Sequence, residues 1–317
     1  MSSKNVRKLY REAARVKRMY DKIDAEDKAM KEKAYARAER RELKALRAAQ
    51  GVKPKKKNKK ATVIKACSLL GFFLIWQAIC MINSSAHFFN PKFLPSPTDI
   101  LQTGYEFIID GTLWSHLTSS LYRTLFGFAL GVAVALILGI LTTSIPLLDN
   151  IISPILNMVG PIPVFAFLPM FIIWFGIGEE SKIVLIAYAT FMPLLSYTVD
   201  GIKNTNPVLI RSAKSLGANQ FQIFTKVILK SALPNVFVGM KVSLALTFSA
   251  LVVAEMMGAS KGLGFMINDA RNWFKLDQMF LAAALIGVEY TIFYGVLSFL
   301  EKILFKWKRS GLTSAVE

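Results

Sequence analysis

Long apolar segments separated by short polar connections dominate the chain after residue 60. An α-helix needs about 20 residues to cross the hydrocarbon core of a bilayer. Six segments are long enough, and they run roughly over residues 61–83, 117–143, 151–175, 182–203, 233–257 and 279–304. The pattern therefore predicts an all-α membrane protein with six transmembrane helices.

The third apolar segment differs from the others because it contains several prolines, which remove backbone hydrogen bonds from a helix. In a membrane, the freed backbone groups persist only where protein or water satisfies them. We therefore expect this segment to be kinked or partly unwound and to line a water-filled path through the protein; a static kink used only for packing is the alternative. The predicted gate residues are Pro161, Pro163, Phe165, Phe167, Pro169 and Met170.

The first 60 residues have a different composition from the rest. They contain 22 Lys and Arg against 8 Asp and Glu, so they carry 14 of the chain's 18 net positive charges. Residues 4–49 lack Gly and Pro and favour a helix, with a short coiled-coil-like seam that begins at Val6. Six lysines in residues 51–60 are expected to hold this segment at an anionic membrane surface. Three regions follow: a basic helical arm at 1–60, a membrane domain at 61–305 and a tail at 306–317.

Lys and Arg in the connections indicate the orientation. They are enriched in residues 203–230 and 302–309, whereas in the other connections Asp and Glu offset the Lys and Arg residues. By the positive-inside rule, both termini and the connection at 204–232 are expected in the cytoplasm.

The connection at 204–232 predicts a short helix, a turn and a second helix. Asn206 and Pro207 form a helix start, Gly217 a stop, and Asn219 a second start. An apolar stripe faces one side and basic residues the other, which provides a surface for a partner. The residues assigned to this surface are Asn206, Pro207, Leu209, Ile210, Arg211, Ala213, Lys214, Leu216, Gly217, Ala218 and Phe221.

Charged residues inside the predicted spans are costly and invite a functional hypothesis. Glu255 and Glu289 are candidates for the pathway, although Glu289 could instead form an internal pair between the fifth and sixth spans. Arg123 is expected to snorkel to the outer interface, with contact to an anionic cargo as the alternative.

Several sequence blocks resemble the permease subunits of bacterial ATP-binding cassette (ABC) importers, in the branch that takes up sulfonates, taurine, nitrate or bicarbonate, and thiamine precursors. The blocks, in order, are FLPSPTDIL at 93–101, FLPMFIIWFGIGEESKI at 167–183, DGIKNTNP at 200–207, SAKSLGA to LPNVFVGMK at 212–241 and VAEMMGASKGLGFMI at 253–267. Two positions depart from the family pattern: Arg211 stands in place of the usual glutamate, and Lys230 in place of a proline.

The resemblance implies the type I ABC importer permease fold in a bacterial inner membrane. It also implies that the 204–232 loop docks on a separate ATPase subunit, present in two copies, which holds the ATP and Mg²⁺. A second permease copy, an extracytoplasmic substrate-binding protein and membrane lipids are the other implied partners.

The chain contains no phosphate-binding loop of the form GxxxxGK[ST], and no cofactor or specific nucleic acid is expected on this chain. It offers no nucleophile and base pattern, so we do not expect an enzyme. A metal site at His87 or His116 is not expected either. Two alternatives stay open: a secondary transporter driven by an ion gradient, and a membrane scaffold with a basic recruiting arm.

Overall fold

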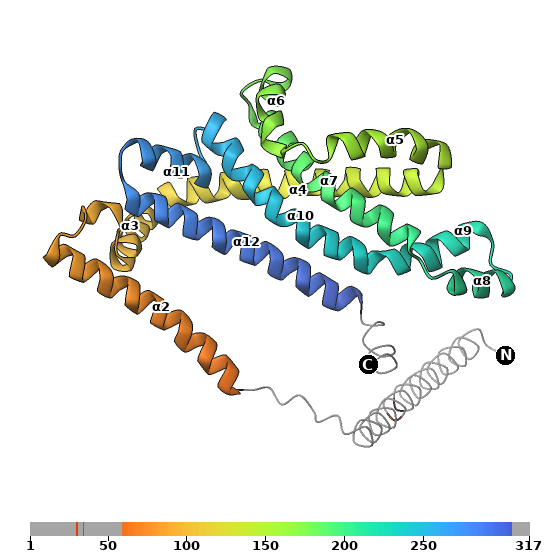
Figure 1. The fold of residues 1–317 in the computed structure, drawn as a ribbon, viewed down its shortest axis with the longest axis horizontal. Helices are drawn as coiled ribbons and strands as arrows, with labels where there is room; N and C mark the ends of the chain where they lie inside the picture. The colour runs from red at the N-terminus through yellow and green to blue at the C-terminus, as the bar shows by residue number, and fades with distance from the viewer. Residues whose placement is uncertain (1–29, 31–33, 35–58, 306–317) are drawn as a thin grey trace, which may run out of the picture. The chain divides into compact units, whose positions relative to one another are not determined.

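The computed structural model describes residues 59–305, together with Met30 and Ala34. The predicted arm at 4–49, its seam and the tail at 306–317 therefore lie outside the described residues. The chain divides into two units, Met1–Leu70 and Gly71–Glu317, and most of the described residues belong to the second. Every regular element in this part is helical, as predicted (Figure 1).

Five helices are long and apolar enough to cross a membrane, and a bent pair adds a sixth crossing if it counts as one span. The five are α2 (Lys59–Ala86), α4 (Thr112–Ser144), α7 (Glu179–Lys203), α10 (Leu229–Gly258) and α12 (Leu276–Leu304). Their positions confirm five of the six predicted segments.

The third predicted segment is the bent pair. Helix α5 (Pro146–Val159) ends at Gly160, and the chain then turns by 97° into η2 (Val164–Phe167) and α6 (Leu168–Phe175). Pro161 and Pro163 occupy the break, and Pro169 lies in the first turn of α6. Pro154, by contrast, is accommodated inside α5 without ending it. The expected interruption is therefore present, but only the later prolines are part of it.

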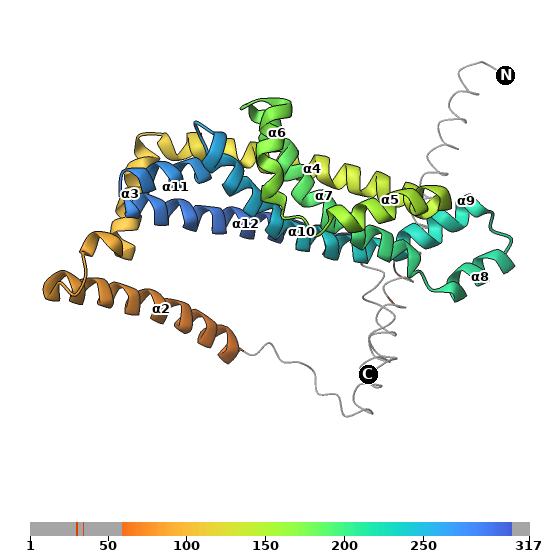
Figure 2. The ribbon, with the colours of Figure 1, turned by 45° about the horizontal axis from the view of Figure 1, so that its top comes forward.

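Short helices cap the two ends of the bundle. At one end lie η1 (Pro91–Phe93), α3 (Pro97–Ile109) and α11 (Leu263–Asn272). At the other end lie α8 (Pro207–Ser215), α9 (Gln220–Ile223) and the π-helical turn η3 (Phe224–Ile228), which leads without a break into α10 (Figure 2). We call these the α11 end and the α8 end.

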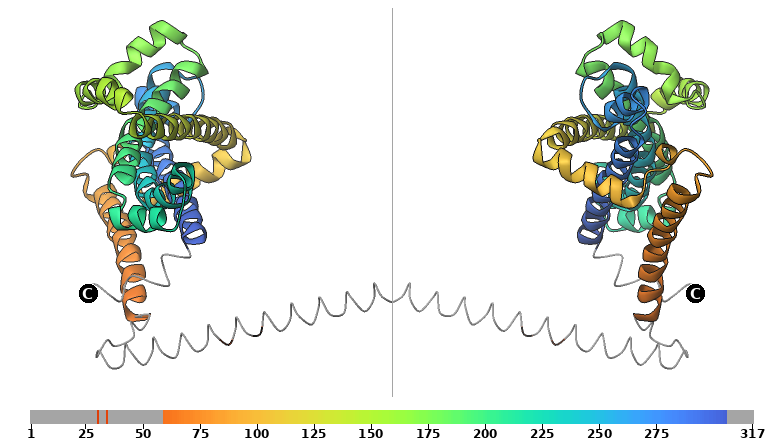
Figure 3. Two further views of the ribbon diagram at one scale, coloured as in Figure 1. Left: turned by 90° about the vertical axis from the view of Figure 1, so that its right-hand side faces the viewer. Right: turned by 90° about the vertical axis from the view of Figure 1, so that its left-hand side faces the viewer.

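Helix α7 lies between α4 and α10 and forms the centre of the bundle (Figure 3). Glycines on α4 allow its backbone to approach α7 closely. A Cβ atom added to Gly131 would lie 2.5 Å from the Ala187 carbonyl oxygen and 2.6 Å from the Thr190 Cβ. Small residues at such positions are the usual means by which membrane helices pack, since lipid provides no hydrophobic drive for their association.

Hydrogen bonding reinforces the contact between α7 and α10. The Thr190 and Thr247 hydroxyls lie 2.7 Å apart, and both side chains are fully buried. Each hydroxyl also contacts a carbonyl of its own helix, so neither is left unsatisfied. The pair fixes the register of the two helices at the centre of the bundle.

The tight α4–α7 contact generates a prediction. Gly131→Ala should lower the midpoint of thermal unfolding in detergent, because overpacking a close contact costs about 1–3 kcal/mol. Gly295→Ala on α12 is the matched control, since nothing lies within 4 Å of the added Cβ. That control should be neutral or slightly stabilising, because alanine is the better helix former. Equal midpoints for the two variants would contradict the close approach.

Candidate functional site

A cluster of buried charges lies towards the α11 end of the bundle. Arg123 on α4 is only 4% exposed, so the predicted snorkelling is wrong. Its Nε and Nη2 atoms donate to the two carboxylate oxygens of Glu179 at 2.6 and 2.8 Å. Its Nη1 atom donates to Glu255 at 2.7 Å and to the Lys261 carbonyl at 2.7 Å. One guanidinium therefore joins α4, the first turn of α7, the end of α10 and the following loop.

Glu255 is fully buried and accepts hydrogen bonds from two elements, α4 and α11. Besides Arg123, it accepts from the Ser120 hydroxyl at 2.8 Å and from the Gly264 amide at 2.8 Å. The Ser120 oxygen in turn accepts from the Leu263 amide at 2.8 Å. The carboxylate therefore binds the beginning of α11, where free amide groups favour an anion.

The loop between α10 and α11 is shaped to admit this carboxylate. Gly262 has a φ of +128°, and a Cβ atom there would lie 2.4 Å from the Glu255 carboxyl carbon. Its amide donates to His116 Nδ1 at 3.0 Å. His116, one residue before the predicted second span at 117–143, lies on α4 and holds this loop.

Lys182 completes the cluster. Its ammonium lies 3.1 Å from Glu179, one turn earlier on α7, and its side chain is 5% exposed. Two cations and two carboxylates balance, which meets the requirement that buried charges be paired. Sequence reasoning singled out Arg123 and Glu255 separately but missed their pairing and the participation of Glu179.

Glu289 on α12 is different. It is 5% exposed, and neither carboxylate oxygen has a hydrogen-bond partner within the described residues. The alternative of an internal pair between the fifth and sixth spans is therefore wrong. An ion pair between these two spans forms farther along α12, where Lys241 on α10 pairs with Glu301. A pathway role for Glu289 and for Glu255 stays a prediction.

A cavity of about 410 Å³ lies beside the broken segment. It is lined by the break around Pro161, by Tyr188 and Met192 of α7, and by Leu246 of α10. The Tyr188 hydroxyl is buried and has no partner in this part of the chain. The structure therefore places Pro161 beside α7 and α10.

Of the predicted gate residues, Pro161 alone lines this cavity. Phe167 packs on Tyr188, with ring centroids 4.8 Å apart. Phe165 and Met170 are 42% and 41% exposed. Pro163 and Pro169 set the backbone of the break and of α6. A gate formed by these residues stays a prediction.

The predicted docking surface has the expected local structure. The Asn206 side chain caps α8 by accepting from the Val208 amide at 2.9 Å. At the other end Gly217 has a φ of +78°, a conformation that glycine adopts without strain. The Ala218 amide donates to the Ala213 carbonyl and the Gly217 amide to that of Lys214, so the turn is a Schellman motif. Asn219 then starts the second helix with a capping box.

Apolar side chains on this turn face outward. Leu216 is 87% exposed, Phe221 75% and Leu209 50%. Pro207, Arg211 and Lys214 are also exposed, whereas Ile210 and Ala213 are half-buried. Exposed apolar residues at the end of a bundle are typical of an interaction surface.

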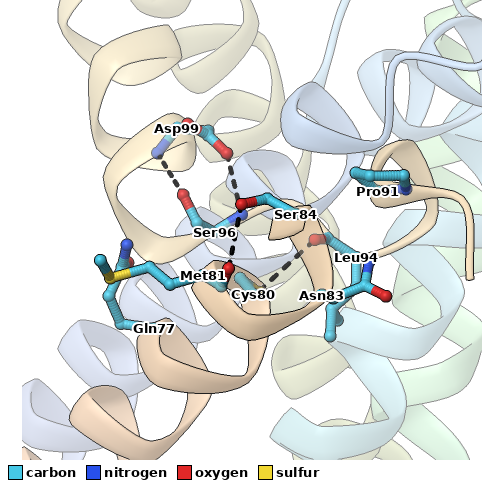
Figure 4. A pocket seen from close by; sticks show the side chains of 9 residues that line it. All are labelled: Gln77, Cys80, Met81, Asn83, Ser84, Pro91, Leu94, Ser96 and Asp99. Atoms are coloured by element: carbon cyan, nitrogen blue, oxygen red, sulfur yellow. Dashed lines mark hydrogen bonds between the residues drawn. The ribbon is translucent and has the colours of Figure 1, made fainter. Parts of the chain in front are cut away.

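A smaller pocket of about 230 Å³ lies between the end of α2 and the start of α3 (Figure 4). Its polar groups are largely occupied by local contacts. Ser96 and Asp99 form the capping box of α3, and Ser84 donates to the Met81 carbonyl. Asn83 bonds the backbone of Phe89 twice. We interpret this pocket as a brace for the connection rather than a ligand site.

Comparison with known proteins places the chain in a family. Residues 109–310 match the family model for the binding-protein-dependent transport system inner membrane component. The taurine transport system permease protein TauC of Escherichia coli (strain K12) is 36% identical over 219 residues, which cover 68% of this chain and 78% of TauC. SsuC of Bacillus subtilis (strain 168), a permease protein named for aliphatic sulfonate transport, is 37% identical over 236 residues. These residues cover 74% of this chain and 84% of SsuC.

One further relative and two solved structures also resemble this chain. The riboflavin transport system permease protein RibX of Chloroflexus aurantiacus is 34% identical over 243 residues, covering 77% of this chain and 89% of RibX. An amino acid ABC transporter crystal structure has a TM-score of 0.51 at 17% identity over 64% of this chain and 96% of that chain. The MetNI methionine ABC transporter in an inward-facing form has a TM-score of 0.50 at 19% identity, over 63% and 98%. These two likenesses support the fold alone.

The family match and the relatives favour an importer permease over a secondary transporter or a scaffold. The chain belongs to the family of inner-membrane permease components of binding-protein-dependent ABC transport systems.

Proposed function

We propose that this chain is the permease subunit of an ATP-driven importer for a small organic anion, with a sulfonate such as taurine as the substrate class. The single observation that carries the mechanism is the outward-facing apolar turn at the α8 end, which is held rigidly by its caps. The relatives named for taurine and aliphatic sulfonate transport support the substrate class. The riboflavin relative makes a flavin the competing substrate.

A separate ATPase subunit binds the α8 turn in this proposal. Leu216, Phe221 and Leu209 enter an apolar groove of the ATPase, and movement of the ATPase displaces the turn. Because α9, η3 and α10 form one continuous helix from Gln220 to Gly258, the displacement reaches the other end of the bundle. With α8 on the cytoplasmic side, both termini are cytoplasmic, in agreement with the distribution of Lys and Arg.

The complete importer contains two ATPase copies, a second permease copy and an extracytoplasmic binding protein. The pathway passes the cavity beside Pro161 and Tyr188, where the broken segment meets α7 and α10. Phe165, Phe167 and Met170 close it, and Pro161, Pro163 and Pro169 hold the backbone of that closure. The chain itself transfers no chemical group; ATP and Mg²⁺ belong to the ATPase.

Rigid coupling predicts that Gly217→Val separates ATP hydrolysis from uptake. A left-handed backbone costs an ordinary residue about 1–2 kcal/mol, and a β-branched residue tolerates it worse. Gly217→Asn is the matched control, since asparagine accepts this conformation. In proteoliposomes with the partner ATPase, Val should abolish most ATP-driven uptake and Asn should retain it. Wild-type uptake by the Val variant, or an equal loss in both, would refute rigid coupling through this turn.

Docking through the exposed side chains predicts that Leu216→Ser weakens binding of the ATPase about tenfold or more, as for an apolar anchor at an interface. The control is Leu101→Ser on α3, at the opposite end of the bundle, where the leucine is 73% exposed. The measurement is the dissociation constant of the purified permease and ATPase. Unchanged affinity for Leu216→Ser would place the docking surface elsewhere.

The substrate class is tested by uptake. Vesicles holding the permease, its ATPase and its binding protein should accumulate labelled taurine only with ATP, and excess aliphatic sulfonate should compete. Riboflavin and thiamine precursors should neither compete nor accumulate. Accumulation of riboflavin without taurine uptake would overturn the sulfonate assignment and leave the importer mechanism standing.

A further inference from the structure

A second cavity, of about 330 Å³, opens directly beside the buried guanidinium of Arg123. Its walls come from α4, the first residue of α7 and the loop between α10 and α11, at Tyr122, Arg123, Glu179, Ser260 and Lys261. It is separate from the cavity at the broken segment, with which it shares no lining residue. The cavity has the size of a small-molecule site.

Hydrogen-bond donors without partners surround this cavity. Within the described residues, the Tyr122 hydroxyl, the Ser260 hydroxyl and the Lys261 ammonium make no hydrogen bond or ion pair. Two further lining hydroxyls, of Thr118 and Ser119, donate to carbonyls of their own helix at 2.7 and 2.8 Å and are not free. The available groups are therefore donors and a positive charge, which together suit an anion.

Glu179 is the member of the charge cluster whose side chain can move away from Arg123. Its side chain is 46% exposed, whereas those of Arg123, Lys182 and Glu255 are buried. It lies at the first position of α7, where the helix end stabilises a carboxylate that has left Arg123. Gly176, three residues before it, has a φ of +81°, and no atom of the described residues lies within 4 Å of a Cβ there.

We propose that this cavity is an anion-binding site, in which the sulfonate or carboxylate head of a small molecule replaces Glu179 on Arg123. The planar guanidinium presents two parallel donors, Nε and Nη2, that fit either oxyanion. The exchange keeps the cluster neutral, because one anion replaces another between Arg123 and Lys182. Lys261, Tyr122 and Ser260 supply the further donors. This inference rests on the proposed function for its ligand class, but not for its geometry.

The test measures binding of methanesulfonate to the purified full-length chain by calorimetry, without the binding protein and at an ionic strength held constant with chloride. Dimethyl sulfone, which is uncharged and nearly the same shape, is the matched ligand control. Methanesulfonate should bind and the sulfone should not. Arg123 is left intact, because its loss would leave Glu255 buried without its charge partner.

Three variants distinguish the site from general electrostatics. Glu179→Gln removes the competing carboxylate and should tighten methanesulfonate binding about tenfold, as expected for loss of a close like charge. Lys261→Gln should weaken binding by about threefold or more, as for a partly exposed charge pair. Glu180→Gln makes the same charge change one residue along α7, where the carboxylate makes no ion pair in the described residues, and should leave affinity unchanged.

Several outcomes would overturn the site. They are no binding by either the wild type or Glu179→Gln, equal binding of the sulfone, and equal effects of Glu179→Gln and Glu180→Gln. If Glu179→Gln does not fold, Lys261→Gln and the two ligands still decide. ATP-driven taurine uptake combined with any of these results would remove the site and leave the proposed function intact. Binding as expected, without uptake of any sulfonate, would remove the proposed function and leave the site.

Discussion

Close contact between the backbones of α4, α7 and α10 is the constraint on which the rest of the structure depends. Apolar side chains gain little by leaving lipid for another helix, so these helices are held by contact distance and by buried hydrogen bonds. Gly127, Gly131 and Gly139 lie along α4 where it meets α7, and each leaves no room for a Cβ atom. Between α7 and α10, the buried hydrogen bond of Thr190 and Thr247 holds the two helices together. A shift of α7 would disturb both contacts together.

This three-helix contact positions the charge cluster. Arg123 lies on α4, Glu179 begins α7, and Glu255 lies near the end of α10. The charge cluster forms because the three helices are already adjacent, and it then fixes the loop that leads to α11. At the opposite end, α10 continues from the turn after α8. In the proposed importer, one helix therefore links the ATPase to the charge cluster.

The buried charges show two ways of placing a carboxylate in a membrane protein. Glu255 has a guanidinium, a hydroxyl and a backbone amide as partners, so its charge is compensated. Glu289 has none of these within the described residues, although it is almost as deeply buried. Burial of a polar group without a hydrogen-bond partner is costly. The two glutamates, equivalent in a hydropathy plot, therefore differ in chemistry.

The sequence alone determined the helical class, the six apolar segments, the break in the third of them, and the caps and glycine turn around α8. These features follow from local rules, since helix period, capping and proline act within a few residues. It also assigned the family through short blocks of residues. Only the tertiary structure decided that Arg123 is buried, that Glu289 has no hydrogen-bond partner among the described residues, and that Glu179 joins the cluster. Those contacts join residues 56 and 132 positions apart, and their distances depend on how the helices pack rather than on any pattern along one of them.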